Sequence, residues 1–248
     1  MQVVMNIFKN IAGRIWALWA LLSFIVTFLI IFIPAMITYL IPGTKGQKIF
    51  IGISRIWMSV WLYLVGCPLK VNGKKYFHKN TAYIVTCNHN SILDVPISCP
   101  FIPGGNKTIA KSSFTRIPLF GWFYRKGSVL VDRKSEISRR KSFDAMKKVL
   151  ASGLHMSIYP EGTRNRTDEP MKRFYDGAFK LAVATNTAII PAIILHSKKA
   201  LPINKPFYFL PHRLQMDFLE AIPVNGQTAE QLKDKVFEIM KNYYVQHN

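Results

Sequence analysis

The spacing of apolar residues divides the chain into two parts. Residues 15–42 contain no charged side chain, and at about 1.5 Å per residue a helix of this length spans the ~30 Å hydrocarbon core of a bilayer. The run is too long for the apolar part of a signal peptide, and no small-x-small cleavage pattern follows it. The pattern predicts a retained membrane anchor, and the alternative is a very apolar pair of core helices.

A second apolar segment covers residues 56–69, with Arg55 before it and Lys70 after it. Its length suits an interfacial or re-entrant helix better than a full span. The stretch "GTKGQK", residues 43–48, reads as a short basic turn between the two segments. Amphipathic side chains that favour the head-group level occur in both: Trp16, Trp19, Trp57, Trp61 and Tyr63. Two geometries therefore stay open, a spanning helix followed by a surface helix, or a hairpin held in one leaflet.

Beyond residue 71, short apolar runs alternate with longer amphipathic ones. The short runs predict strands at residues 82–87, 107–110, 128–132, 154–159, 188–195 and 214–222. Helical periodicity is found at 136–153, at 176–186 and from a Thr228 cap onward, where Leu232, Val236, Ile239, Met240 and Tyr243 share one face. Alternating strands and helices predict an α/β fold with a mixed central sheet flanked by helices. We expect two domains, membrane-anchoring helices at 1–70 and the α/β domain at 71–248.

The charge of the chain indicates a preference for anions. It contains 33 Lys and Arg and 13 Asp and Glu, which gives a formal net charge of +20. Nucleic acid, anionic lipid and an acidic carrier protein all satisfy that preference. The basic residues are dispersed and the aromatic residues lie mainly in apolar segments, so a nucleic-acid-binding module is disfavoured.

The cysteines and the membrane segment predict the location. Cys67, Cys87 and Cys99 have no C-x-x-C spacing, which disfavours a disulfide framework or zinc site and favours a reducing compartment. The basic residues that flank the long apolar run favour the cytoplasmic side for the rest of the chain. We therefore expect a membrane protein on the cytoplasmic face, in a bacterium the inner membrane, with no metal and no bound cofactor.

The stretch "NHNSILD", residues 88–94, contains the first acidic side chain of the chain, Asp94, five positions after His89. His89 is expected at the carboxyl end of a buried strand, where open α/β sheets build their sites. A carboxylate on Nδ1–H of the ring would leave Nε2 basic and stabilise the imidazolium. The bland interpretation is an acid at a helix start beside an ordinary loop histidine.

A nucleophile beside His89 is disfavoured. Cys87 and Ser91 are each two residues away, and side chains two apart on an extended chain stand about 6 to 7 Å from each other at Cα. Covalent catalysis requires the nucleophile at hydrogen-bond distance from its base. His89 is therefore expected to deprotonate a substrate hydroxyl, and a hydrolase that uses Cys87 and His89 is the alternative.

The stretch "YPEGTRNR", residues 159–166, also leaves a strand end, with Glu161 and Arg164 expected to project from the turn. An arginine fork grips phosphate with two hydrogen bonds. Lys111 and Arg133 follow two other predicted strands. Each alone is typical of a solvated surface charge, but together they indicate an anion site at one sheet edge.

These blocks resemble the glycerolipid acyltransferases, the family of 1-acylglycerol-3-phosphate acyltransferase. "NHNSILD" is similar to the family's H-x4-D signature, and residues 110–133, "YPEGTR" and "AIIPAII" are similar to its second, third and fourth blocks, in the same order. The resemblance covers roughly residues 70–220.

The resemblance implies a role for each matching position. His89 would be the general base for a lysophospholipid hydroxyl and Asp94 its orienting partner. Acyl-CoA or an acyl carrier protein thioester would be the donor. The acceptor's phosphate would be held by a set of substrate-binding residues: Glu161, Gly162, Thr163, Arg164, Arg133 and Lys111. Tyr175 and Asp176 depart from the family, which often has a basic pair there, and this departure bears on the identity of the acceptor.

The sequence therefore predicts a membrane-bound acyltransferase that makes phosphatidic acid. The alternatives are the same transfer to another lysolipid, such as a lyso-aminolipid, and a basic module that only binds.

Overall fold

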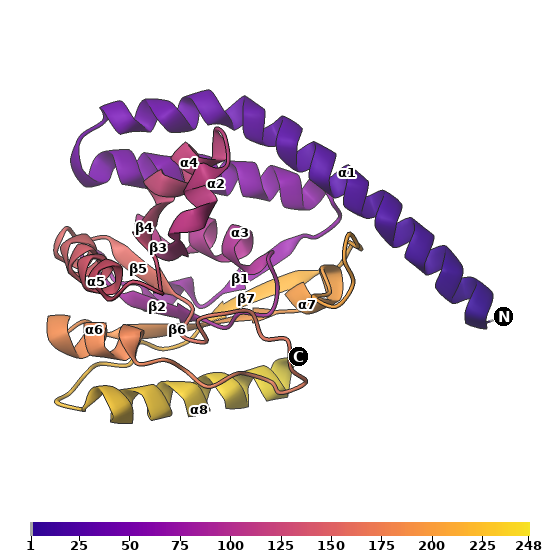
Figure 1. Ribbon diagram of the computed structural model, residues 1–248. Helices are drawn as coiled ribbons and strands as arrows, with labels where there is room; N and C mark the ends of the chain where they lie inside the picture. Colours follow the sequence, from indigo (N-terminus) through magenta and orange to yellow (C-terminus); the bar gives the residue numbers. More distant parts are fainter. Residues whose placement is uncertain (1) are drawn as a thin grey trace.

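A seven-stranded sheet forms the centre of the computed structural model, which describes residues 2–248. The strands are β1 (Leu69–Asn72), β2 (Ile84–Cys87), β3 (Asn106–Lys111), β4 (Ser128–Val131), β5 (His155–Ile158), β6 (Ile189–Leu195) and β7 (Leu214–Phe218). Their order across the sheet is β1-β7-β6-β2-β5-β3-β4 (Figure 1). Every neighbouring pair is parallel except β6 and β7. The mixed sheet flanked by helices confirms the predicted fold class.

Helices cover both faces of this sheet (Figure 1). The α-helices are α1 (Gln2–Ile37), α2 (Gly43–Leu64), α3 (Asp94–Ser98), α4 (Phe120–Gly127), α5 (Glu136–Ala151), α6 (Gly177–Thr185), α7 (Ser197–Ala200) and α8 (Ala229–His247). Short 3-10 turns are η1 (Thr38–Leu40), η2 (Lys74–Tyr76), η3 (Cys99–Phe101) and η4 (Ser112–Arg116). One apolar cluster joins α1, α2 and α3 to one face of the sheet, and a second joins α5, α6 and α8 to the other.

Helices α1 and α2 lie side by side as a hairpin on the first face (Figure 1). The basic turn expected at residues 43–48 is wrong, because this stretch forms the first turns of α2. Gly46 is needed there, since a Cβ atom would stand 2.4 Å from the Ile41 carbonyl oxygen. Gln47 is buried and donates to the Asn106 carbonyl at 2.8 Å. These contacts bind the polar start of the helix to the rest of the fold.

The tryptophans hold the hairpin together. Trp16 and Trp19 of α1 donate to the carbonyls of Val65 and Leu64, each at 3.0 Å. In the other direction, the indole N–H groups of Trp57 and Trp61 donate to Thr27 Oγ1 at 2.9 Å and to the Ala20 carbonyl at 3.1 Å. The indole N–H groups of all four tryptophans therefore have partners inside the hairpin, and their head-group position stays a prediction. Tyr63 is 81% exposed.

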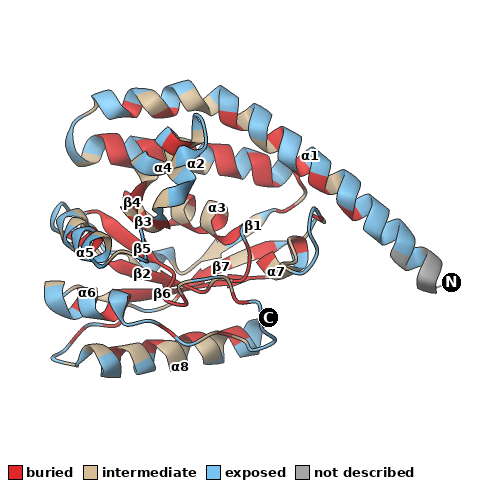
Figure 2. Cartoon of the chain, in the orientation of Figure 1, coloured by how far each residue is buried: buried red, intermediate tan, exposed pale blue. Residues whose placement is uncertain are grey.

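The outer surface of the hairpin is apolar and exposed (Figure 2). Its large exposed side chains include Leu22, Ile25, Val26, Leu29, Ile30 and Ile33 of α1. The segment 7–40 is the helix in the described residues that is long and apolar enough to cross a membrane, and it is mostly unburied. Helix α1 packs along α2 and shares an apolar cluster with the sheet, so the two segments form a hairpin, while its placement in one leaflet stays a prediction. The division into domains at residue 70 stays a prediction.

Smaller differences concern the ends of elements. The strand expected at 214–222 stops at Phe218, with a single further bridge from Ile222 to Ile189. The β1 strand was missed. Helix α8 begins at the expected cap, where Thr228 and Gln231 form a reciprocal capping box. On its inner face Tyr244 is buried, whereas Tyr243 and Ile239 are only half-buried.

Candidate active site

Four parallel strands bring the predicted residues to one edge of the sheet. Strands β2, β5, β3 and β4 are neighbours and run in the same direction. His89 follows β2, Glu161 follows β5, Lys111 ends β3 and Arg133 follows β4. The carboxyl ends of parallel strands meet at a shared edge, so these four residues start from the same edge of the sheet.

His89 and Asp94 form a side-chain pair. The Nδ1 atom of His89 lies 2.9 Å from Oδ2 of Asp94, and the Asp94 side chain is fully buried while that of His89 is 17% exposed. Asp94 is the first residue of α3, as expected. With Nδ1 donating to the carboxylate, the lone pair of the neutral ring is on Nε2. The pair is thus arranged to accept a proton at Nε2.

The Asp94 carboxylate is held by three further donors. Its Oδ2 atom also accepts the backbone N–H groups of Asn90 at 2.6 Å and Ser91 at 2.7 Å. Its Oδ1 atom accepts the hydroxyl of Ser197, the first residue of α7, at 2.6 Å. A buried carboxylate needs such donors to replace lost water. Ser197 was missed by the sequence analysis, because nothing in a residue 103 positions away marks it as a partner of Asp94.

The backbone of His89 is fixed by the loop that follows β5. Its N–H donates to Oε1 of Glu161 at 2.7 Å, and its carbonyl accepts the N–H of Asn165 at 2.6 Å. The ring lies against that of Tyr159, with ring centres 4.5 Å apart. Tyr159 is anchored through its hydroxyl, 2.5 Å from that of Ser98. The two predicted motifs therefore form one unit.

Glu161 does not project from its turn as expected. It is fully buried, and its second oxygen, Oε2, accepts the N–H of Lys172 at 3.0 Å. Burial raises the pKa of this carboxyl above its ordinary value, while the two backbone N–H donors oppose the rise. In this structure Glu161 ties two loops together below the surface.

The basic residues differ in their involvement. Arg133 is exposed and its Nη1 donates to the carbonyl of Gly162, which closes the turn with φ of +71°. Arg164 is half-buried, and its guanidinium makes no hydrogen bond or ion pair with any residue that the structure describes. Lys111 is exposed at the end of β3. Thr163 accepts from Lys172 Nζ at 2.7 Å. These cations thus lie at the same strand ends as the partly exposed His89 and the buried Glu161.

Neither neighbouring nucleophile is placed to react with His89. Cys87 is fully buried in the apolar cluster, and burial raises the pKa of its thiol well above the ordinary value. Ser91 is also buried, and its hydroxyl donates to the Leu201 carbonyl at 3.1 Å. A thiol held in its neutral form is a poor nucleophile. The geometry supports the expectation that His89 acts on a bound hydroxyl.

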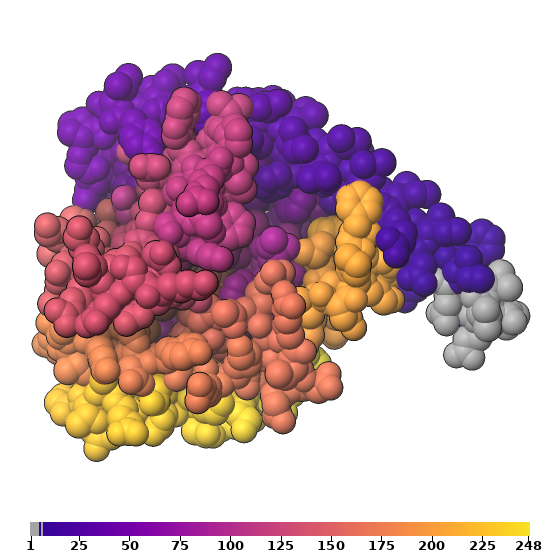
Figure 3. Space-filling view, in the orientation of Figure 1, coloured from indigo at the N-terminus to yellow at the C-terminus, as the bar shows by residue number. Residues whose placement is uncertain are grey.

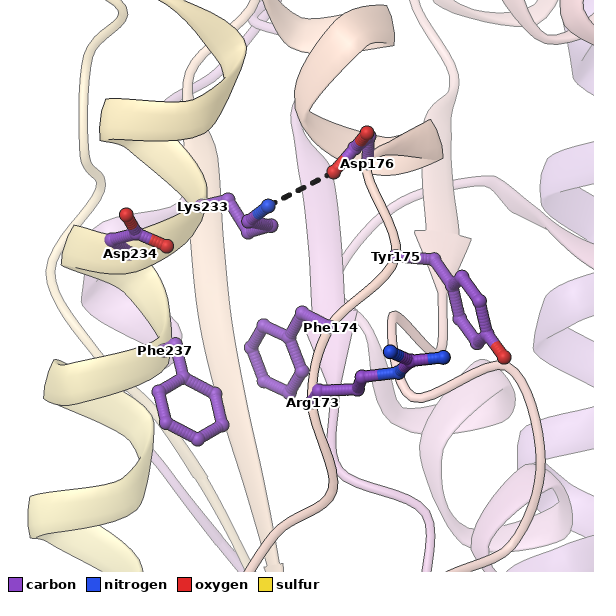
Figure 4. Close-up of a pocket in the computed structure, with 7 residues that line it drawn as sticks. All are labelled: Arg173, Phe174, Tyr175, Asp176, Lys233, Asp234 and Phe237. Carbon is purple, nitrogen blue, oxygen red and sulfur yellow. Dashed lines mark hydrogen bonds and ion pairs between the residues drawn. The ribbon is translucent and has the colours of Figure 1, made fainter.

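The departure at Tyr175 and Asp176 is neutralised locally. Asp176 lies 3.0 Å from Lys233 Nζ and 3.5 Å from Lys180 Nζ, and these contacts lower its pKa (Figure 4). Both acid and lysine line a cleft of about 490 Å³ between α8 and the loop before α6. The ring of Tyr175 lies against Gly162, where an added Cβ would meet it at 2.8 Å. The two lysines therefore offset the negative charge of Asp176, which reduces its repulsion of a bound anion.

No cluster of three or more His, Cys, Asp and Glu suited to a metal occurs in the part of the chain that the structure describes. All three cysteines, Cys67, Cys87 and Cys99, are unpaired.

Comparison with known proteins adds three findings. A family model described as Acyltransferase matches residues 68–195. The chain is similar to a 1-acyl-sn-glycerol-3-phosphate acyltransferase of Cocos nucifera, with 27% identity over 75% of this chain and 59% of that protein. It is similar to the protein of the same description from Saccharomyces cerevisiae, with 28% identity over 76% of this chain and 65% of that protein. The chain thus spans less than two thirds of the length of either relative.

A solved structure has the same fold. The crystal structure of the 1-acyl-sn-glycerophosphate acyltransferase of Thermotoga maritima matches with a TM-score of 0.79 and 22% identity, over 95% of this chain and 96% of that one. The match includes the hairpin as well as the sheet.

Proposed function

Because this chain belongs to the acyltransferase family, we propose that it moves a fatty acyl group from an acyl thioester to the free sn-2 hydroxyl of 1-acylglycerol 3-phosphate, giving phosphatidic acid. The observation that carries the proposal is the buried Asp94 carboxylate 2.9 Å from Nδ1 of the partly exposed His89. The names of the two relatives supply the acceptor.

In this reaction His89 is the general base. Its Nε2 takes the proton of the acceptor hydroxyl while the hydroxyl oxygen attacks the thioester carbonyl carbon. Asp94 fixes the tautomer and stabilises the imidazolium that forms. The C–S bond then breaks and the new ester bond remains. The sulfur takes the proton from the His89 imidazolium and leaves as a thiol. The acyl group is never attached to the protein, which agrees with the burial of Cys87 and Ser91.

The acceptor's phosphate lies on the rim of the site. Arg164 has a guanidinium free of protein partners among the described residues, and Arg133 holds the turn at Gly162 beside it. A guanidinium grips phosphate in a bidentate manner. Lys111 adds charge from the end of β3, and Glu161, Gly162 and Thr163 shape the loop. We assign Glu161 to positioning, because both its oxygens accept backbone N–H groups.

The apolar hairpin keeps the site at the lipid surface. The exposed outer side chains of α1 and α2 would be buried in the bilayer, which is where a lysolipid and its product reside. We place the protein on the cytoplasmic face, in a bacterium that of the inner membrane, and its three unpaired cysteines support a reducing compartment.

The test is acyl transfer by the purified protein in vesicles with a panel of lysolipids and one labelled acyl thioester. We expect labelled phosphatidic acid from 1-acylglycerol 3-phosphate in preference to acylated products of lyso-aminolipids or of lysophospholipids with larger head groups. A clear preference for an acceptor without a terminal phosphate would overturn the assignment and favour the second candidate. Lipid binding without any turnover would leave only a binding module.

A further inference from the structure

Helix α5 presents an outward face that is basic and contains one apolar side chain. At 100° per residue, Ile137, Arg140, Lys141 and Lys148 project to the side opposite the buried Ser142, Met146 and Leu150. All four of these outward residues are exposed, and Ile137 is 67% exposed. Lys134, which is also exposed, lies two residues before the start of the helix. We call Lys134, Ile137, Arg140, Lys141 and Lys148 the basic face.

Helix α5 carries more positive than negative charge. Helix α5 contains five Lys and Arg and two acids, whereas α8, which covers the same side of the sheet, contains three Lys and three acids. On α5, Arg140 pairs with Glu136 at 2.7 Å, and the one acid on the outward side, Asp144, lies 3.9 Å from Lys147. Lys134, Lys141 and Lys148 are left without a carboxylate within ion-pair distance among residues 2–248.

The stability of the helix does not account for this charge. The positive end of a helix dipole lies at the N-terminus, so cations in the first turns are unfavourable there. Arg139, Arg140 and Lys141 occupy the first two turns of α5, with Glu136 as the single acid of the first turn. These cations favour a partner of negative charge.

The membrane is not that partner. The apolar hairpin lies on one side of the sheet and α5 packs on the other, in a different apolar cluster. Figure 3 shows the rose-coloured surface of α5 below the indigo and violet hairpin. A bilayer that buries the outer side of α1 would leave the basic face in water.

The start of α5, which carries part of the basic face, is linked to the candidate site by direct contacts of Arg139 and Arg133. Arg139 Nη1 donates to the Arg133 carbonyl at 2.8 Å, and Arg133 donates in turn to the carbonyl of Gly162. Gly162 follows Glu161, which accepts the backbone N–H of His89. A partner seated on the start of α5 therefore stands beside the turn at Gly162, on the side away from the hairpin.

We propose that the basic face docks an acidic carrier protein that delivers the acyl group as a thioester, so that the donor arrives from water and the acceptor from the bilayer. This inference rests on the proposed acyl transfer. The part of the basic face on α5 extends from Ile137 to Lys148, about 16 Å along the helix. That extent and the exposed isoleucine match the face of a folded acidic protein better than the clustered phosphates of a nucleotide.

The experiment compares two donors in the same vesicles, an acyl thioester on an acidic carrier protein and the same acyl group on coenzyme A. The variants are Lys134→Glu with Lys141→Glu, and separately Ile137→Ala. The matched control is Lys235→Glu, an exposed lysine on α8. We expect the α5 charge reversal to raise KM for the carrier-protein thioester by about tenfold or more, with kcat and all coenzyme A kinetics within twofold of wild type. Ile137→Ala should raise the same KM by a smaller factor.

Three results would overturn the inference while leaving the proposed function intact. They are transfer from coenzyme A but not from the carrier protein, equal losses with both donors, and an equal effect of the α8 control. A loss of vesicle binding by the charge-reversed protein would identify the face as a lipid contact instead. Failure of both donors with every lysolipid would overturn the proposed function itself.

Discussion

At the residue scale, His89 depends on groups from two separate segments, its own loop and the loop after β5. Asp94 sets its tautomer, Glu161 and Asn165 fix its backbone on both sides, and the ring of Tyr159 lies against it. Such placement reduces the reorganisation that a general base would need during proton transfer. The arrangement also explains why two sequence blocks far apart in the chain act together.

Replacing Cys87 by alanine tests whether the protein uses a covalent intermediate. The thiol is buried and its pKa is raised, so it cannot supply a thiolate at neutral pH. Cys87→Ala should keep at least half of the wild-type rate of acyl transfer, with a small loss of stability from the missing sulfur. If folded Cys87→Ala protein instead lost as much activity as a variant without His89, the result would support a mechanism that uses the thiol.

The sequence predicts the central pair but not its surroundings. A histidine and an acid five positions apart, at the end of an apolar run, are local features, and the structure places them 2.9 Å apart. The direction of Glu161 and the contact of Ser197 depend on how distant strands and loops pack. No local pattern encodes those contacts, so the expectation that Glu161 projects into the site was wrong.

At the element scale, β5 and the entry to β2 are joined through His155. The N–H of Tyr83 donates to its Nδ1 at 3.1 Å, and burial lowers the pKa of His155 from 6.5 to about 4. Protonation therefore requires the loss of a backbone contact in the middle of the sheet.

The pH dependence of stability results from this shift. Between pH 6.5 and about 4 the unfolded chain binds the proton more readily than the folded one. The contribution of neutral His155 to the free energy of unfolding is complete above pH 6.5. It is lost as the pH falls toward 4, by up to about 3 kcal/mol. Denaturant unfolding of wild type and His155→Gln in detergent should give curves whose difference narrows across this window. Parallel curves from pH 7 to pH 4 would show that His155 does not titrate as described.

Strands with strong apolar runs were predicted to within a few residues, whereas two elements that depend on tertiary contacts were not. Strand β1 has only four residues and forms at the sheet edge by pairing with β7, which lies more than 140 residues later. The start of α2 is polar, and its helical state depends on contacts of Gly46 and Gln47 with other segments. In both cases packing overrides the local pattern.

At the scale of the whole molecule, the two sides of the sheet have different surroundings. One side ends in the apolar outer surface of the hairpin, and the other in charged helices that face water. Between them, the strand ends hold the candidate site, where an acceptor from the bilayer and a donor from water can meet. The fold class and the hairpin's apolar character were predictable from the sequence. The packing of α1 along α2 was not, because length and hydropathy allow a spanning helix equally well.

Membrane association should depend on the outer side of α1. Ile30 is 69% exposed there, and a lysine in its place would have to enter the apolar layer. Ile30→Lys should lower vesicle partition by roughly tenfold, as seen in flotation with vesicles of neutral lipid. The matched control is Val245→Lys on α8, 61% exposed, which should float as wild type does. Equal flotation of both variants would contradict the hairpin as the anchor.

The most direct test of the account is the rate of labelled phosphatidic acid formation by His89→Ala in vesicles that contain 1-acylglycerol 3-phosphate. With folding and vesicle binding unchanged, we predict a loss of about 10²-fold to 10⁴-fold in turnover, because His89 supplies the general base in the proposed mechanism. Turnover within a few-fold of wild type would contradict the assignment of His89, and with it the mechanism proposed for this site.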